Sequence, residues 1–369
     1  MSAQTAMIGR PIRDLDTPAL MVDLDKLERN IATMRRVIIQ EARIGWRPHC
    51  KAIKTPAIAH MLLRAGAHGV TCAKLGEAEV MAAAGIQDIL IANQVVGEQK
   101  VARLAHLLRH ADVIVAVDCE AHVKALDAAA QAAGTRLRVV IEVNIAMNRA
   151  GAEPGEPTLA LAKQVASCRG LRFAGLMAWE GGRLAEIPQP DEKRGKIQAA
   201  VGLLTASAER CRAAGLPVEI VSCGGTGTYW ITATLPGVTE VQAGGGVFGD
   251  VHYRKDYGVE HEQALTLLTT VVSRPTPTRI ICDAGWKAMS PLPALPQPLG
   301  VDGVGSVKLS AEHATIELTT PRAAPGVGER VEFVAGYCDS TVCLHDELYG
   351  VRAGRLEVIW PILGRGKLR

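Results

Sequence analysis

Short apolar runs alternate with longer amphipathic segments through the first two thirds of the chain. Eight such runs occur, at residues 45–51, 69–73, 88–92, 112–117, 137–143, 171–178, 218–222 and 239–243. Segments with helical periodicity lie between them, at 55–65, 75–84, 98–109, 119–132, 156–168 and 192–214. Strands that read as continuous apolar runs are typical of a parallel sheet that is buried on both faces. Eight repeats of strand and helix predict a (β/α)8 barrel, the TIM barrel.

The pattern changes after about residue 262. Strand-like runs then occur at 265–273, 278–283, 314–318, 330–334 and 356–360, separated by turns rich in proline and glycine. This pattern predicts a second, C-terminal all-β domain. An apolar stretch at 17–24 precedes the barrel and is expected to pair into that second domain. We therefore predict an α/β barrel over residues 26–261 and a β-rich domain from residues 1–25 and 262–369.

Two glycine-rich segments follow the last two predicted barrel strands. The first is Ser-Cys-Gly-Gly-Thr-Gly-Thr at 222–228, and the second is Ala-Gly-Gly-Gly at 243–246. A doubly wound open sheet is the structural alternative, but in a barrel these two segments become neighbours and form the usual phosphate site. Backbone amides that carry no side chain can converge there on an anion. The glycines therefore favour the barrel and predict phosphate binding.

Lys51 ends the first of the eight runs, so it is expected at the mouth of a barrel strand. A lysine amine attacks aldehydes when desolvation or nearby cations lower its pKa, and Arg47, His49 and Lys54 are close in sequence. Together with the phosphate site, this lysine predicts a pyridoxal phosphate site, in which the cofactor ring serves as an electron sink. Arg149, after the fifth run, is a candidate contact of the ring oxygen or of a substrate carboxylate.

Composition limits the classes of partner. The 41 basic and 38 acidic side chains give a net charge of +3 without long runs of one sign, so neither nucleic acid nor an anionic membrane is expected as a partner. Nine scattered cysteines without a CxxC pair indicate reduced thiols. No uninterrupted apolar segment of membrane-spanning length and no signal peptide is recognisable. We therefore expect a cytoplasmic protein that acts on a small molecule.

The chain resembles the fold-type III pyridoxal phosphate enzymes of the alanine racemase barrel class, specifically the branch of D-threonine aldolase and D-serine dehydratase. The resemblance covers nearly the whole chain and depends on the motifs at 16–18, 47–51, 224–227, 242–244, 283–287, 312–313 and 338–346. It implies a Schiff base at Lys51 and a head-to-tail homodimer in which the β domain of one subunit completes the other's site. The cofactor contacts that we predict are Lys51, Arg149, Ser222, Gly224, Gly225, Thr226, Gly227, Gln242, Gly244 and Gly245.

The resemblance implies a carbon–carbon lyase that cleaves D-3-hydroxy amino acids by a retro-aldol reaction to glycine and an aldehyde, through an aldimine on Lys51. A dehydratase acting on D-serine or 3-hydroxyaspartate and an amino-acid racemase are the alternative enzymes. Racemases of this class use a tyrosine of the β domain as second base, and Tyr337 is the candidate. A non-enzymatic pyridoxal phosphate carrier is a further alternative, although such carriers are usually single domains.

Members of this branch typically hold a divalent metal (Mn, Mg or Zn) through a His-x-Cys or His-x-Asp pair. The matching positions are Tyr337 and Asp339. A phenol is a poor metal ligand compared with imidazole, so a metal is uncertain and Asp339 is the one candidate ligand.

Other departures from the branch lie at Ile53 (usually His), at Trp179-Glu180 (usually Tyr-Gln) and at Gly246 (usually aromatic). They predict an altered substrate or reaction preference. The candidates for the catalytic base are His49, His313, Tyr337 and Glu180.

Overall fold

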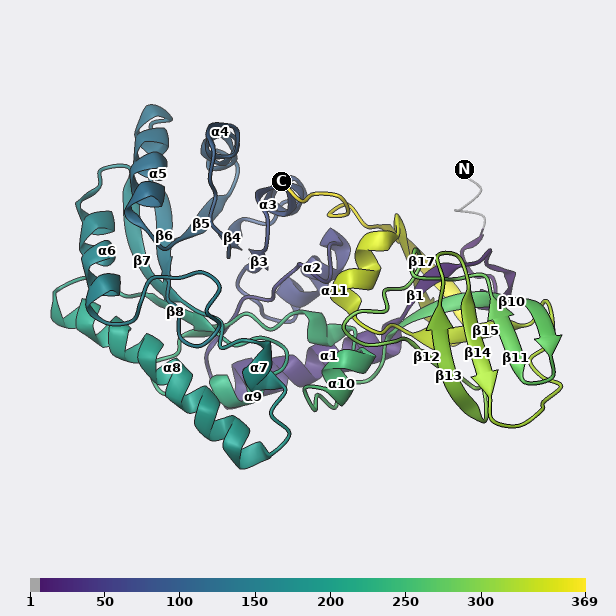
Figure 1. The fold of residues 1–369 in the computed structure, drawn as a ribbon. Helices are drawn as coiled ribbons and strands as arrows, with labels where there is room; N and C mark the ends of the chain where they lie inside the picture. Colours follow the sequence, from purple (N-terminus) through teal and green to yellow (C-terminus); the bar gives the residue numbers. More distant parts are fainter. Residues whose placement is uncertain (1–6) are drawn as a thin grey trace. The chain divides into compact units, whose positions relative to one another are not determined.

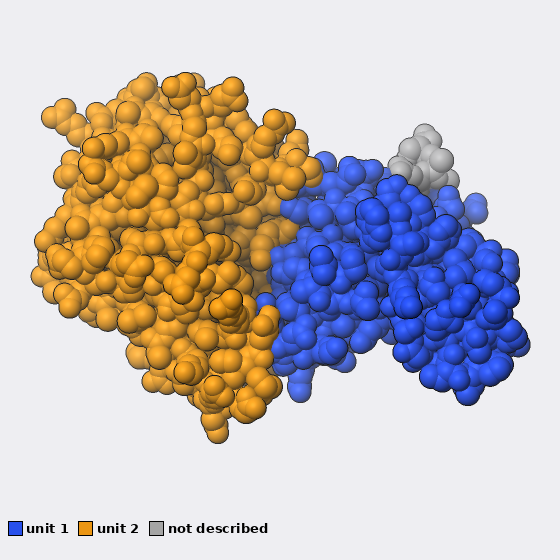
Figure 2. Space-filling view, in the orientation of Figure 1, with its two compact units in different colours: residues 1–32, 52–55, 245–365 blue, residues 33–51, 56–244, 366–369 orange. Residues whose placement is uncertain are grey.

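The structure, a computed structural model, describes residues 7–369 (Figure 1). The chain divides into two compact units (Figure 2). Of the described residues, unit 1, blue in Figure 2, contains 7–32, 52–55 and 245–365, and unit 2, orange, contains 33–51, 56–244 and 366–369. The two units are groups of residues that pack compactly together, and they are not defined by the repeat pattern of the sequence. They therefore do not test the predicted domain boundaries at residues 26 and 261, which stay a prediction.

Unit 2 contains eight parallel strands, and each overlaps one of the eight predicted runs, with β8 ending one residue beyond its run. They are β2 (Gly45–Trp46), β3 (Val70–Cys72), β4 (Asp88–Ile91), β5 (Asp112–Val117), β6 (Leu137–Glu142), β7 (Leu171–Met177), β8 (Ile220–Cys223) and β9 (Glu240–Val241). Their order in the sheet is β2-β9-β8-β7-β6-β5-β4-β3, and every neighbouring pair is parallel. Apolar side chains of β4 to β8, among them Leu90, Ile114 and Val140, form a buried core.

The two end strands of this sheet meet just beyond β2. His49 and Thr71 form an isolated parallel bridge, Cys50 N–H donates to Thr71 O at 2.7 Å, and Thr71 N–H donates to Pro48 O at 2.9 Å. The sheet therefore curls round on itself, and the predicted (β/α)8 barrel class is confirmed, with closure through a bridge in place of a full ladder.

Helices separate the strands of unit 2, as predicted. The longer ones are α2 (Pro56–Arg64), α3 (Leu75–Ala83), α4 (Glu98–Leu107), α5 (Glu120–Ala132), α6 (Glu156–Ser167) and α8 (Pro190–Ala213). Each has a buried apolar face; in α4 this face is Val101, Leu104 and Leu107, at the spacing of one helical stripe. The single-turn helices α7 (Gly182–Ala185) and α9 (Tyr229–Thr232) are too short to be recognised by periodicity.

Unit 1 is built on a nine-stranded sheet. Its strands are β1 (Ala19–Asp23), β10 (Leu265–Thr276), β11 (Arg279–Cys282), β12 (Gln297–Leu299), β13 (Val304–Leu309), β14 (Ala314–Leu318), β15 (Arg330–Val334), β16 (Glu347–Arg352) and β17 (Arg355–Pro361). β1 pairs antiparallel with β10 and parallel with β16. The predicted pairing of the N-terminal strand with the second domain is therefore confirmed.

Two parts of unit 1 differ from the prediction. Short helices, α10 (Val251–Lys255) and α11 (Cys338–Thr341), accompany the sheet, so the unit is mostly rather than entirely β. β12, β13 and β16 lie outside the predicted runs because they are polar or only half buried, as the residues Val304–Leu309 of β13 show. The helix α1 (Leu24–Arg35) and the single π-helical segment η3 (Arg36–Glu41) follow β1. No helix in the described part of the chain is both long and apolar enough to cross a membrane.

Candidate active site

Lys51 and Arg149 face the same aromatic ring in unit 2. The Lys51 Nζ lies 5.8 Å from the centroid of Trp179, and the Arg149 Cζ lies 5.7 Å from it. Trp179 follows β7, Arg149 lies in the loop after β6, and Lys51 lies in the turn that follows the His49 bridge. All three therefore belong to the carboxyl ends of the barrel strands, which is where barrel enzymes carry their active sites.

Trp179 also contacts the glycine-rich segment after β8. A Cβ atom placed on Gly225 would lie 3.0 Å from Trp179 Nε1, so the indole packs directly against the loop backbone. Gly224 has a φ of +81°, a conformation that residues with a Cβ rarely adopt. The indole thus joins Lys51, Arg149 and the predicted phosphate loop into one cluster of side chains.

Glu180 holds the phosphate loop from within the protein. Its side chain is buried, with 1% of its surface exposed. The carboxylate accepts hydrogen bonds from Thr232 Oγ1 at 2.6 Å, from Thr228 Oγ1 at 2.8 Å and from the Gly224 amide at 3.1 Å. Because three hydrogen bonds fix this buried carboxylate in place, Glu180 shapes the loop, and this arrangement speaks against the predicted role as a mobile base.

The segment after β9 packs against the chain that leads to Lys51. A Cβ on Gly244 would lie only 2.2 Å from His49 O, so no larger residue fits without a backbone shift. The Gln242 side chain donates to Ser222 Oγ at 2.9 Å, and the Gln242 backbone carbonyl accepts from the His49 amide at 2.9 Å. β8 and β9 pair in parallel register, which brings their two glycine segments side by side.

The structure therefore brings together most of the predicted cofactor contacts within unit 2. These are Lys51, Arg149, Ser222, Gly224, Gly225, Thr226, Gly227, Gln242 and Gly244. Gly245, in contrast, belongs to unit 1, where a Cβ would lie 2.7 Å from the Tyr253 phenol oxygen. Backbone amides, the Thr226 hydroxyl and a lysine amine form a donor set suited to a phosphate and an aldehyde, so the residues fit pyridoxal phosphate.

Arg47 does not act as the predicted cation beside Lys51. Its buried guanidinium pairs with Glu240 at 3.0 Å and with Asp88 at 2.8 Å, which are the first residues of β9 and β4. Burial acts to raise the pKa of Glu240, but the hydrogen bond from His68 and the charge of Arg47 outweigh it and lower the pKa to about 2. Arg47 is thus neutralised at the amino ends of these strands.

Arg149 has an acidic neighbour. Its Nη2 lies 3.9 Å from Oε1 of Glu142, which is buried at the end of β6 and accepts a hydrogen bond from Gln94. Burial raises the pKa of Glu142, while Gln94 and Arg149 act in the opposite direction. The Arg149 side chain is more than half exposed, so the guanidinium is accessible to a carboxylate ligand.

Tyr337 and Asp339 lie in unit 1, in a cluster of aromatic and acidic side chains. The Tyr337 ring packs edge-to-face on His252 at 5.1 Å and on Tyr253 at 5.6 Å between ring centroids. The Tyr253 phenol donates to Asp339 Oδ1 at 3.4 Å. Burial, and then the negative charge of Asp339, raises the pKa of Tyr337 far above the ordinary phenol value. The phenol therefore keeps its proton.

This cluster does not fit a divalent metal. Among the described residues, the set of three or more His, Cys, Asp or Glu side chains with closely spaced ligand atoms is Asp118, Cys119 and His122, in unit 2. Asp339 belongs to no such set, and a protonated phenol offers a cation little.

His313 lies apart from this cluster in sequence, in the exposed turn between β13 and β14. There its backbone carbonyl accepts hydrogen bonds from the amide and hydroxyl of Ser310.

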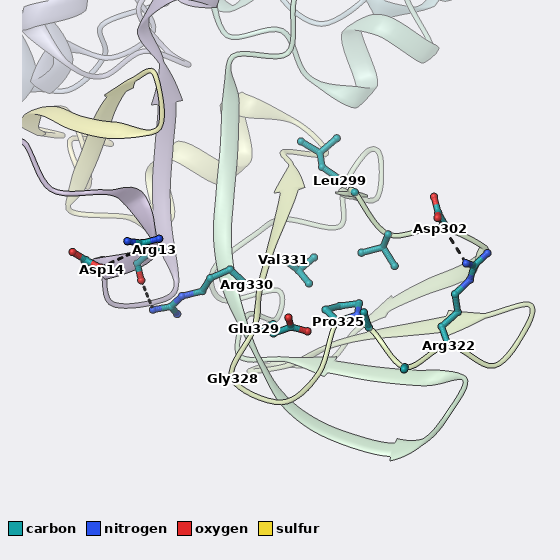
Figure 3. A pocket seen from close by; sticks show the side chains of 14 residues that line it. Arg13, Asp14, Leu299, Asp302, Arg322, Pro325, Gly328, Glu329, Arg330 and Val331 are labelled. Carbon is teal, nitrogen blue, oxygen red and sulfur yellow. Dashed lines mark hydrogen bonds and ion pairs between the residues drawn. The ribbon is translucent and has the colours of Figure 1, made fainter.

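A pocket of about 820 Å³ in unit 1 carries none of this chemistry (Figure 3). Residues of β15 and of the loops at 299–302 and 322–330 line it. Four of its charged side chains form ion pairs, Arg13 with Asp14 at 3.9 Å and Arg322 with Asp302 at 3.8 Å. The predicted site residues lie elsewhere.

Sequence reasoning named Trp179 and Glu180 only as departures from the branch, with Glu180 also a candidate base. It missed the role of Trp179 as a common neighbour of the site residues, the presence of Tyr253, and the structural role of Glu180. The available signal for the first and third was position, because both directly follow the predicted strand 171–178 at the carboxyl edge of the barrel. Tyr253 gave no signal, since its contact with Asp339 depends on the fold.

Two family models match this chain. The family model described as alanine racemase, N-terminal domain, matches residues 22–252, and a serine dehydratase domain model matches residues 264–351. A D-threonine aldolase from Arthrobacter sp is 35% identical over 365 residues, covering 98% of this chain and 96% of that protein. A 3-hydroxy-D-aspartate aldolase from Paracoccus denitrificans (strain Pd 1222) is 35% identical over 373 residues, covering 98% and 95%.

Two solved structures are similar over nearly the same length. The D-threonine aldolase from Filomicrobium marinum superposes with a TM-score of 0.94 at 37% identity, covering 98% of both chains. The D-threo-3-hydroxyaspartate dehydratase from Delftia sp. HT23 superposes with a TM-score of 0.86 at 28% identity, covering 96% of this chain and 99% of that one.

Proposed function

Because the chain belongs to the family of the alanine racemase N-terminal domain, we propose that it is a pyridoxal phosphate-dependent lyase that cleaves D-3-hydroxy amino acids to glycine and an aldehyde. The observation that carries the proposal is the cluster in which Lys51 and Arg149 face Trp179 beside the Gly225 loop. The similar D-threonine and 3-hydroxy-D-aspartate aldolases support the type of reaction and the class of substrate.

Two parts of the cluster would hold the cofactor. Lys51 would bind its aldehyde end, and the segments Gly224–Gly227 and Gly244 would bind its phosphate through backbone amides and the Thr226 hydroxyl. When bound, pyridoxal phosphate supplies an electron sink for the charge that remains on Cα when the Cα–Cβ bond breaks. Glu180 keeps the phosphate segment in shape through its three hydrogen bonds.

Arg149 would orient the substrate. Its exposed guanidinium is suited to a bidentate contact with an amino-acid carboxylate, and Trp179 and Glu142 fix it from two directions. Trp179 covers the Gly225 backbone and limits the access of water to that part of the site. Cleavage also needs a base for the β-hydroxyl proton. His49 is the proposed base, with His313 as a second candidate from the exposed β13–β14 turn. Tyr337, the remaining candidate from the sequence, is not proposed as a base because its phenol keeps its proton.

The decisive experiment is to measure acetaldehyde release from D-threonine, with L-threonine as the control. Oxo-acid formation from D-serine and D-3-hydroxyaspartate and loss of optical rotation are measured in parallel. Aldehyde from the D-isomer alone is the expected result. An oxo acid without aldehyde would identify a dehydratase, racemisation would identify a racemase, and a cofactor spectrum that no amino acid perturbs would identify a carrier.

We also propose that the protein is a homodimer. Trp286, Leu292 and Leu295 of unit 1 are large apolar side chains that are 50%, 70% and 46% exposed, and their burial in a subunit interface would stabilise a dimer. Light scattering of the purified protein tests this, and a monomer that is fully active would contradict it.

A cytoplasmic location is proposed as well. All nine cysteines are free thiols, which suits a reducing compartment. Fractionation of expressing cells tests it.

A further inference from the structure

We infer that the Tyr337–Asp339 site of unit 1 works without a divalent metal, because hydrogen bonds from phenols take the place of a cation at the Asp339 carboxylate. This inference rests on the proposed lyase function, since it concerns how the same enzyme manages its reaction. The groups around Asp339 support it, because they form hydrogen bonds or pack on one another.

The first observation is that the acidic and imidazole groups of this region are committed to other partners. Both oxygens of Asp250 accept backbone amides, from Tyr253 at 2.7 Å and from Cys338 at 2.8 Å. His252 Nδ1 lies 2.6 Å from Asp256 Oδ2, which fixes the imidazole on its own helix α10. These contacts hold the cluster together, and they occupy both carboxylate oxygens of Asp250 and one ring nitrogen of His252.

The second observation is that phenols surround Asp339. Tyr253 donates to its Oδ1 at 3.4 Å, and the Tyr337 phenol is also within hydrogen-bonding reach. Such bonds compensate the negative charge that would otherwise attract a cation. A metal would have to displace the Tyr253 phenol from Asp339, and the side chain at position 337 offers it a phenol in place of the imidazole that first-row divalent ions prefer.

The third observation is that aromatic and apolar side chains pack together in this region. The rings of His252, Tyr253, Tyr257 and Tyr337 pack on one another with centroid distances from 4.5 to 6.1 Å. Ile53, where the resembling branch usually has a histidine, also belongs to unit 1 and is completely buried. An apolar side chain offers no ligand atom, so two of the positions that could supply imidazole supply none.

The first test uses the purified holoenzyme. Metal content is measured by mass spectrometry before and after exhaustive chelation, and manganese chloride is then titrated by calorimetry. We expect well under one metal ion per subunit. Asp339→Asn should leave any manganese binding unchanged, because Asp339 is not a ligand. Chelation should change the rate of D-threonine cleavage by less than about twofold. An Asp118→Asn variant controls for the ligand set of Asp118, Cys119 and His122.

One bound ion per subunit that Asp339→Asn removes, with cleavage that stops on chelation and returns with manganese, would overturn the inference. Failure of the proposed function looks different. A protein that cleaves no D-3-hydroxy amino acid with or without manganese is not this lyase, yet its metal content and calorimetry still decide whether Asp339 holds a cation.

The second test converts the site. Tyr337→His places an imidazole beside Asp339, and Tyr337→Phe removes the phenol hydroxyl without adding a ligand. We expect the histidine variant to bind manganese at least about tenfold more tightly than the wild type, and the phenylalanine variant to bind no better. Addition of Asp339→Asn to the histidine variant removes the gain. If Tyr337→His binds manganese no better than the wild type, the phenol is not what excludes the cation.

Discussion

The indole of Trp179 lies 5.8 Å from Lys51 Nζ and 5.7 Å from Arg149 Cζ, so one aromatic ring faces both cations of the proposed site. A third contact, with the Gly225 backbone, makes this ring the common neighbour of the aldehyde-binding, carboxylate-binding and phosphate-binding groups. The predictions below test these contacts one at a time.

Lys51→Ala is expected to abolish the visible absorbance of the bound cofactor, because no other residue of unit 2 is proposed to bind its aldehyde. Cleavage of D-threonine should fall by at least about 10³-fold. The variant is compared with the wild type by absorption spectroscopy after incubation with pyridoxal phosphate and dialysis. A retained visible band would show that another amine holds the cofactor.

Gly225→Ala is expected to weaken cofactor binding, since the new methyl group would lie 3.0 Å from Trp179 Nε1 and would displace the indole or the loop. We expect about a tenfold rise in the dissociation constant of pyridoxal phosphate, equivalent to about 1.4 kcal/mol. Gly202→Ala, on the exposed face of α8 with no atom within 4 Å of the new methyl, is the matched control. The control should be as stable as the wild type or up to about 1 kcal/mol more stable. Equal cofactor affinity in the two variants would contradict the packing argument.

Glu180 tests the shape of the phosphate loop. Glu180→Gln should be mild, because the amide oxygen can accept from Gly224 and the amide nitrogen can donate to the two threonine hydroxyls. Glu180→Ala leaves three buried donors without their acceptor, and should cost about 2–4 kcal/mol of stability and at least about tenfold in cofactor affinity. Urea unfolding and cofactor titration measure both. Two variants with the same loss would mean that the hydrogen bonds do not matter.

The pair of Arg47 and Glu240 predicts a pH dependence of stability. The pKa of Glu240 is about 2 in the folded protein and near 4.5 when unfolded, so its stabilising effect is complete above about pH 4.5 and is lost as the pH falls towards 2. The lowering corresponds to about 3 kcal/mol. Stability of the wild type should therefore fall between pH 5 and pH 3 more steeply than that of Glu240→Gln.

The Glu240→Gln variant should already be less stable than the wild type at pH 7, because it leaves the buried Arg47 charge with a weaker partner. Urea unfolding at both pH values is the measurement. Parallel pH profiles for the two proteins would show that Glu240 is not the titrating group.

The barrel strands were readable from the sequence because each lies in a buried apolar run, as Val113 to Val117 of β5 show. The polar strand Val304–Leu309 was not readable, since only its pairing with β14 makes it a strand. The same limit applies to the site. Lys51 and the glycine segments are visible as motifs, whereas the neutralisation of Arg47 by Glu240 joins residues 193 positions apart.

The N-terminal strand β1 has a consequence for the order in which the protein is made. Its partners in the sheet, around Leu268 and Tyr349, follow it by about 250 and 330 residues. A ribosome therefore releases every strand of unit 2 before β1 can find either neighbour. During synthesis the apolar residues Ala19–Val22 therefore remain without their partner strands. Nascent chains that stall after the barrel expose strand β1 to chaperones or to other nascent chains.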